Sequence, residues 1–265
     1  MNVIQEAMLA GRPTCGIWGA GPSALTAETM GRSGLDWVLL DLQHGAVTDA
    51  DLLPVVQAIE LGGSKALVRV AKNDPALIMR ALDLGAIGVV VPMVNTAEEA
   101  RAAASATRYP PAGTRSFGPI RRFYGLDAAS ASTTCLVMIE TAEALANLED
   151  IAATPGVDGL FVGPVDLGLA LGAGLQMGAN PIVDDAITRV IAVARAHGLI
   201  AGAAGLNPQH AEALLAAGAR LVTLGSDAGH LAAGMAADVA RVKSWTERFP
   251  AAAFEPAAPR TRENQ

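Results

Sequence analysis

The stretch TCLVMIETAEALANLEDIAATPGVDGLFVGPVD, residues 134–166, contains one complete unit of the fold. Thr134–Glu140 is an apolar run that ends in a carboxylate, as is typical of a buried parallel strand. Thr141–Ala153 is rich in Ala, Leu and Glu, and its first residue can cap a helix. Gly159–Val162 is a second apolar run. The stretch therefore predicts a strand, a helix and a parallel strand in succession.

The same alternation of apolar runs and helix-like stretches extends over most of the chain. Eight runs fit 265 residues, and eight parallel strands covered by helices predict a (β/α)8 barrel, an α/β fold. An open, doubly wound sheet is the alternative arrangement. The segment up to Gly11 predicts an extra helix before the barrel. The remaining strands are expected at Thr14–Ala20, Trp37–Asp41, Lys65–Ala71, Gly88–Met93, Leu199–Ala203 and Leu221–Gly225.

The pattern predicts a single domain over residues 1–248. Residues 249–265, rich in Pro and Ala, predict a poorly ordered tail. Residues 109–132 form too long a segment for a plain connection, so we expect them to carry a function or an interface.

The composition argues against several classes of partner. A net charge of −7 gives no support for nucleic-acid binding. No apolar run approaches the roughly 18 residues of a membrane span, and the opening segment lacks the apolar core of a signal peptide. Cys15 and Cys135 lie in apolar runs without metal-ligand spacing, which predicts buried thiols. We therefore expect a cytoplasmic protein with a small-molecule partner.

Charged residues recur where the predicted strands end, and the catalytic groups of such barrels lie there. Glu140 and Asp166 follow consecutive strands, and carboxylates that close repel each other unless they share a proton or a cation. Because no Cys or His cluster accompanies them, the expected cation is one that prefers oxygen ligands, Mg²⁺ or Mn²⁺. The competing interpretation is that each carboxylate only caps the next helix.

Two further side chains complete a candidate site. Arg69 lies within the third strand, where its planar fork could bind a carboxylate, or it could be a core arginine paired with an acid. His44 follows Asp41 at the end of the second strand and could transfer a proton near neutral pH. A lone histidine is more often ordinary than catalytic, and the neighbouring groups are what favour a role for His44.

A competing motif lies near the start of the chain. Gly19-Ala20-Gly21-Pro22-Ser23-Ala24 follows a strand and opens a helix, with Asp41 about 20 residues further on. This spacing is typical of a dinucleotide-binding unit and supports an NAD-dependent oxidoreductase as an alternative. The charged groups at the later strand ends argue against it.

Five ordered motifs resemble the metal-dependent hydroxy-oxo-acid aldolases, typified by 4-hydroxy-2-oxoheptanedioate aldolase and 2-dehydro-3-deoxyglucarate aldolase. The resemblance covers residues 2–245 and implies a (β/α)8 barrel in a hexamer that exchanges the last helix between subunits. It also implies a divalent metal, Mg²⁺, Mn²⁺ or Co²⁺, held by Glu140 and Asp166. The motifs are LLDLQHG (39–45), VRV (68–70), VPMV (91–94), MIET (138–141) and GLFVGPVDLGLALG (159–172).

The resemblance also assigns roles to other residues. It implies that pyruvate binds the metal through its carboxylate and keto oxygens, and that Arg69 steadies the keto oxygen and the enolate. It implies that His44 acts as acid and base, with Asp41 beside it and Asp83 placed to pair with it. The pyruvate carboxylate would be received by the backbone around Gly163, Pro164, Val165 and Asp166.

The expected activity is that of a divalent-metal-dependent aldolase. It would enolise pyruvate or hydroxypyruvate and add it reversibly to an aldehyde, or cleave a 4-hydroxy-2-oxo acid. Gln43 and Met138 replace a Glu and a Gln of some family members, which leaves the second substrate open. Lys65 and Lys72 only flank the third strand, which argues against a Schiff-base aldolase. The alternatives are an acyl-CoA lyase of the citramalyl or malyl type and a barrel that binds a small acid without turnover.

Overall fold

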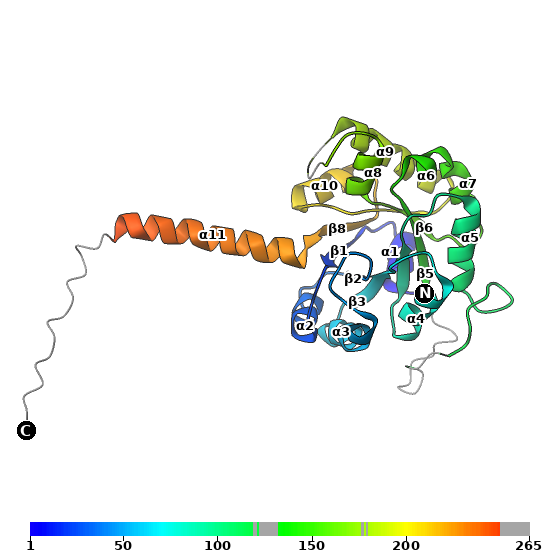
Figure 1. Cartoon of the computed structure of the whole chain (residues 1–265), viewed down its shortest axis with the longest axis horizontal. Coiled ribbons are helices and arrows are strands. Elements are labelled where there is room, and N and C mark those ends of the chain that lie inside the picture. The colour runs from blue at the N-terminus through cyan, green and yellow to red at the C-terminus, as the bar shows by residue number, and fades with distance from the viewer. Residues whose placement is uncertain (119–120, 122–131, 176–177, 179, 250–265) are drawn as a thin grey trace, which may run out of the picture. The chain divides into compact units, whose positions relative to one another are not determined.

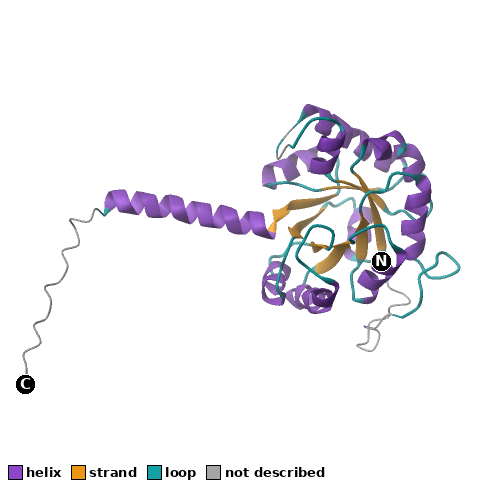
Figure 2. Cartoon of the chain, viewed as in Figure 1, coloured by secondary structure: helices purple, strands orange, loops and turns teal. Residues whose placement is uncertain are grey.

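The computed structural model describes residues 1–118, 121, 132–175, 178 and 180–249. Within these residues the strands form one closed parallel barrel in sequence order, with β8 beside β1 (Figures 1 and 2). The predicted (β/α)8 barrel is confirmed, and the open sheet is wrong. The strands are β1 Thr14–Gly19, β2 Trp37–Asp41, β3 Lys65–Arg69, β4 Gly88–Val91, β5 Thr134–Ile139, β6 Gly159–Val162, β7 Ile200–Ala203 and β8 Leu221–Ser226.

The helices follow the predicted alternation, and α1 (Val3–Leu9) is the extra helix expected before the barrel. The helix expected over Thr141–Ala153 is instead two short helices separated at Asn147. Thr141 caps the first of them, as predicted, by accepting the N–H of Ala144. The helices are α2 Ala24–Gly31, α3 Asp49–Gly62, α4 Pro75–Asp83, α5 Ala97–Ala106, α6 Ala142–Ala146, α7 Leu148–Ala152, α8 Pro164–Ala170, α9 Pro181–Ala196, α10 Pro208–Ala217 and α11 Asp227–Arg248.

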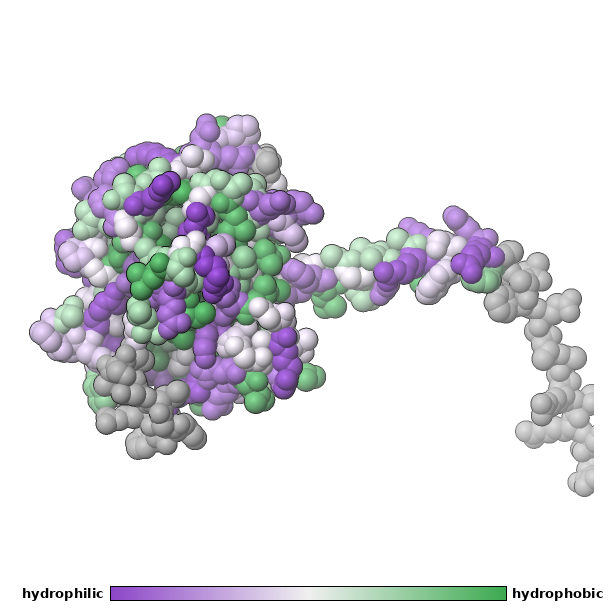
Figure 3. Space-filling view, turned by 180° about the vertical axis from the view of Figure 1, so that it is seen from behind, coloured by the Kyte–Doolittle hydropathy of each residue, from purple (hydrophilic) through white to green (hydrophobic). Residues whose placement is uncertain are grey.

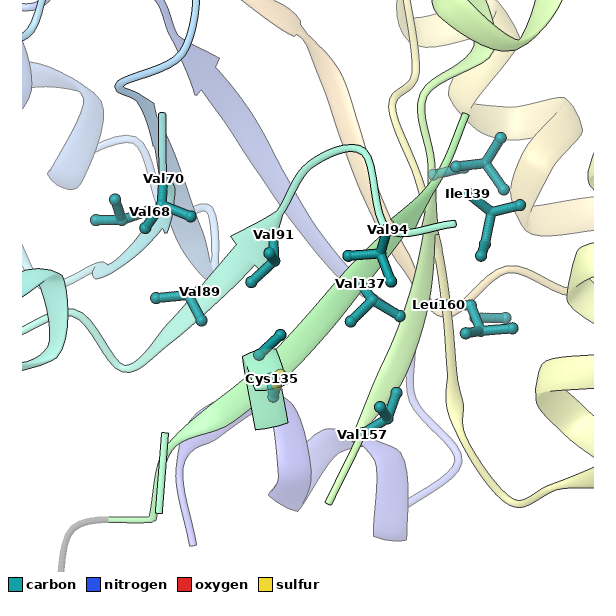
Figure 4. Packing of buried hydrophobic residues seen from close by; sticks show 14 of the residues in the cluster. Val68, Val70, Val89, Val91, Val94, Cys135, Val137, Ile139, Val157 and Leu160 are labelled. Atoms are coloured by element: carbon teal, nitrogen blue, oxygen red, sulfur yellow. The ribbon is translucent and has the colours of Figure 1, made fainter. Parts of the chain in front are cut away.

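The core has two layers because successive strand residues point to opposite faces of the sheet. The larger cluster packs the outward-facing residues of the strands against the helices, and Figure 4 shows its valines on β3, β4 and β5. The smaller cluster fills the barrel interior with residues such as Trp37, Leu67 and Phe161. Ile4 of α1 joins this inner cluster, and Asn2 donates hydrogen bonds to the backbone oxygen of Ile87. The first helix thus closes the amino end of the barrel.

Two matching contacts hold the first residues of neighbouring strands at this end. The carboxylate of Asp36, just before β2, accepts the N–H of Cys15 on β1 and pairs with Arg12 at 3.0 Å. The carboxylate of Asp158, just before β6, accepts the N–H of Cys135 on β5 and pairs with Arg108 at 2.9 Å. We call each contact an Asp staple. Both cysteines are free, Cys135 buried and Cys15 half-buried.

The contacts divide the chain into two units, Met1–Asp227 and Ala228–Gln265. The first unit contains the whole barrel, and the face seen in Figure 3 mixes hydrophilic and hydrophobic residues. The second contains most of α11, whose large apolar side chains recur every three or four residues, from Leu231 to Trp245. The predicted tail from residue 250 onward and most of residues 119–131 lie outside the described residues. No helix in the described part of the chain has the length and apolar character needed to cross a membrane.

Candidate active site

A pocket of about 380 Å³ lies at the carboxyl ends of the barrel strands. It brings together most of the residues predicted for the site, because parallel strands end on the same side of the barrel. The residues that line it are Trp18, His44, Arg69, Met138, Gly163, Pro164, Val165, Asp166, Ala204, Gly205, Leu206, Thr223, Gly225 and Ser226.

Arg69 and Asp41 form a buried ion pair at one side of this pocket. They are register partners on β3 and β2, so their side chains meet directly. Nε and Nη2 of Arg69 donate to the two carboxylate oxygens over 2.9 and 2.6 Å. The indole N–H of Trp18 donates to the same carboxylate over 3.1 Å, and the Trp18 ring stacks on the guanidinium at 4.6 Å. The pair is therefore fixed in position from two directions.

Asp41 is held in its ionised form. Burial by itself would raise its pKa, but the hydrogen bond and positive charge of Arg69, the backbone N–H of His44 and the indole N–H of Trp18 together outweigh burial. The net effect keeps the pKa of Asp41 below its usual value. Asp41 is thus the counter-ion of Arg69. Nη1 of Arg69 takes no part in the ion pair. Because Arg69 lines the pocket, this nitrogen is a donor group available to a ligand.

His44 lines the pocket, but the structure does not give it the partners expected from the sequence. Its contact with Asp41 runs through the His44 backbone N–H, over 3.1 Å. Asp83 is the last residue of α4, which leads to the amino end of β4, whereas His44 follows the carboxyl end of β2. The Asp83 carboxylate instead pairs with Arg115 at 2.8 Å. Within one chain, Asp83 therefore does not reach His44, and their pairing stays a prediction.

Glu140 follows β5 and is 2% exposed. Its Oε1 accepts the backbone N–H of Met93 over 2.7 Å, while its Oε2 is buried without a hydrogen-bond partner. Burial raises the pKa of Glu140, and the charge of Asp166 raises it further; the Met93 N–H and Arg69 act in the opposite direction without cancelling the rise. Glu140 is thus a buried carboxylate with one unpaired oxygen, and Asp166 is a second negative charge near it. Such an arrangement is stabilised by a nearby positive charge.

The free oxygen lies against Gly163, where any side chain would crowd it. A Cβ at Gly163 would lie 2.7 Å from Oε2 of Glu140 and 2.9 Å from Cε of Met138. Asp166, in the first turn of α8, lines the same pocket. A free carboxylate oxygen and a second carboxylate nearby suit a divalent cation that prefers oxygen ligands. In the part of the chain that the structure describes, no group of three or more His, Cys, Asp or Glu could hold a metal.

The glycine-rich motif after β1 does not form a phosphate site. The backbone N–H groups of Ala20 and Gly21 donate to the carboxylate of Asp227 over 3.0 and 3.3 Å. Asp41, which would bind the ribose of a dinucleotide, is committed to Arg69. The Asp227 carboxylate thus accepts the backbone N–H groups that a pyrophosphate would need. The dinucleotide interpretation therefore has no structural support.

Two contributors to the site were missed from the sequence. Trp18 lies near the end of β1, and a search of the strand ends for aromatic as well as charged residues would have found it. Met93 contributes through its backbone N–H and has a positive φ of 56°, which its side chain gives no reason to expect.

Comparison with known proteins gives a consistent result. Residues 14–233, which include every strand of the barrel, match the family described as HpcH/HpaI aldolase/citrate lyase. The 2-dehydro-3,6-dideoxy-6-sulfogluconate aldolase of Pseudomonas putida is 44% identical over 80% of this chain and 86% of that protein. The hydroxypyruvate/pyruvate aldolase of Rhizorhabdus wittichii is 41% identical over 88% and 95%. A HpcH/HpaI aldolase/citrate lyase family protein from Burkholderia cenocepacia has a TM-score of 0.84 at 31% identity, covering 92% of this chain and 100% of that one.

Proposed function

This chain belongs to the HpcH/HpaI aldolase/citrate lyase family and is an aldolase, and we propose that it uses a divalent metal ion to join pyruvate or hydroxypyruvate reversibly to an aldehyde. The observation that carries the proposal is the buried, unpaired Oε2 of Glu140. This oxygen lies against Gly163, which lines the same pocket as Asp166, Arg69 and His44.

Glu140 and Asp166 would hold the ion. When bound, it would supply Lewis-acid stabilisation of the negative charge that develops on the keto oxygen during enolisation. Mg²⁺, Mn²⁺ and Co²⁺ all suit oxygen ligands, and availability decides among them.

The other groups of the pocket bind the 2-oxo acid and move its proton. Arg69, fixed by Asp41 and Trp18, would donate from Nη1 to the keto oxygen. The first-turn N–H groups of Val165 and Asp166 would receive the substrate carboxylate, since the first N–H groups of a helix have no intrahelical acceptor. Pro164, included in the predicted set, has no N–H and can contribute only as a wall.

His44 would carry out the proton transfer. Its imidazole removes a proton from the carbon next to the keto group, and the electrons of that C–H bond form the enolate double bond. The enolate carbon attacks the aldehyde carbon, a C–C bond forms, and the aldehyde oxygen takes up the proton. Cleavage of a 4-hydroxy-2-oxo acid follows the same steps in reverse.

Proton exchange at the substrate tests the proposal without knowledge of the aldehyde. The methyl signal of pyruvate, followed by ¹H NMR in D₂O with protein and Mg²⁺ or Mn²⁺, should disappear, and EDTA should stop the loss. Exchange that EDTA does not affect would refute the metal requirement. No exchange of pyruvate or hydroxypyruvate would refute the nucleophile, and turnover of an acyl-CoA thioester would then favour the lyase alternative.

The same proposal includes assembly. We expect a hexamer in which α11 is exchanged between subunits, and a cytoplasmic enzyme. Light scattering coupled to size-exclusion chromatography would give the mass, and a monomer of 27.0 kDa would refute the hexamer.

A further inference from the structure

The turn between β4 and α5, residues 92–96, makes an unusual contact with the proposed metal ligand. The backbone N–H of Met93 donates to Oε1 of Glu140 over 2.7 Å. Met93 adopts a φ of 56°, in the left-handed region that residues other than glycine rarely occupy. Such a conformation persists only where surrounding contacts hold it, and residues of this kind cluster at functional sites.

Asn95 supplies those contacts on the turn side. Its Nδ2 donates to the carbonyl of Met93 over 3.3 Å, and its backbone N–H donates to Glu99 over 2.6 Å. The carbonyl of Asn95 accepts Nδ2 of Asn147 over 2.8 Å. Asn95 is thus bound through both its side chain and its backbone, and it in turn holds Met93.

Asn95 also reaches the residue next to Glu140. Its Oδ1 accepts the hydroxyl of Thr141 over 2.5 Å. The contacts form a closed circuit: Glu140 accepts from Met93, Met93 is held by Asn95, and Asn95 is bound to Thr141, the neighbour of Glu140 in the chain. The circuit fixes both the backbone and one carboxylate oxygen of Glu140.

We propose that Asn95 is a positioning residue that makes Glu140 a one-oxygen ligand, with Oε1 committed to the Met93 amide and Oε2 left for the ion. The inference rests on the proposed function, because it assumes that Glu140 binds the metal. Outer contacts of this kind orient a ligand before the ion arrives, and their loss typically weakens metal binding.

The test measures metal binding directly, with Mn²⁺ and metal-free protein, by electron paramagnetic resonance titration of free Mn²⁺. Asn95→Ala should raise the Kd for Mn²⁺ by roughly 10–100-fold. Asn2→Ala is the matched control, because Asn2 also donates from Nδ2 to a backbone carbonyl, that of Ile87 over 3.1 Å, but lies at the amino end of the barrel. The control should bind Mn²⁺ like the wild type.

A second variant separates positioning from general loss of stability. Glycine adopts a positive φ at little cost, so Met93→Gly combined with Asn95→Ala should recover part of the Mn²⁺ affinity. Equal affinities of Asn95→Ala and wild type, or equal losses in Asn95→Ala and Asn2→Ala, would overturn the inference alone. If the wild type binds no Mn²⁺, or Glu140→Gln binds it normally, the metal site itself is wrong and the inference falls with it.

Discussion

One methyl group added at Gly163 tests whether the ion binds at Oε2 of Glu140. Gly163 has φ −94° and ψ 92°, a conformation open to alanine, so Gly163→Ala brings no backbone strain. The new Cβ would lie 2.7 Å from Oε2 of Glu140 and 2.9 Å from Cε of Met138. Both separations are shorter than the 3.0 Å below which real Cβ contacts essentially never occur.

The displacement that follows can be estimated. Ordinary contact begins at 3.4 Å, so Oε2 must move by roughly 0.7 Å and Cε by roughly 0.5 Å. Met138 can adjust because its side chain is flexible. Glu140 cannot move freely, because Oε1 is bound to the amide of Met93. Metal–ligand distances tolerate only about 0.2 Å, so we expect Mn²⁺ binding to weaken about 10–100-fold and overpacking to cost about 1–3 kcal/mol of folding free energy.

The assay is a Mn²⁺ titration of metal-free protein, with pyruvate proton exchange measured on the same samples. Gly118→Ala is the control, since a Cβ at Gly118 would meet nothing within 4 Å. Unchanged Mn²⁺ affinity and exchange in Gly163→Ala would refute the reasoning, because they would mean that the ion does not bind against Oε2.

Three other substitutions test the remaining groups. His44→Ala should slow pyruvate proton exchange by roughly 10²–10⁴-fold, measured by NMR; an unchanged rate would remove His44 from the proton transfer. Arg69→Lys should lower kcat strongly because an ammonium reproduces neither the fork to Asp41 nor the additional Nη1 donor of the guanidinium; near-normal turnover would contradict that role. Asp41→Asn leaves the charge of Arg69 buried without a counter-ion and should lower the free energy of unfolding by about 3–5 kcal/mol at pH 7, measured with urea. Because the pKa of Asp41 is lowered, its stabilising effect is present above the usual carboxyl range and is lost as pH falls through the folded value. The difference from wild type should therefore shrink below about pH 4, and a difference independent of pH would count against an ionised Asp41.

The barrel was predictable because its signal is local. Each strand is a continuous apolar run, and the observed strands match the predicted ones to within one or two residues at their ends. The break between α6 and α7 was not predictable, because composition over Thr141–Ala153 favours a continuous helix. Asn147 lies at the break and donates its side-chain N–H to the carbonyl of Asn95, a contact across 52 residues of sequence.

The site was predictable where side chains follow strands. That rule found Asp41, Arg69, Glu140 and Asp166, and the structure brings Asp41 together with Arg69 through strand register. It could not find the amide of Met93, because a backbone group carries no residue-specific signal. The pairing of Asp83 with His44 was expected from the family resemblance alone. That resemblance does not show at which end of the barrel Asp83 lies within one chain.

The two Asp staples make the halves of the barrel alike at its amino end. Each joins an Asp carboxylate to the backbone of a Cys on the preceding strand, and in each the backbone carbonyl of that Cys accepts the N–H of the Asp. One lies on β1 and β2 and the other on β5 and β6, so the arrangement repeats after four strands. The two halves of the barrel differ in chemistry. The first supplies the arginine and histidine that would handle the substrate and its proton, and the second supplies both carboxylates that would hold the metal.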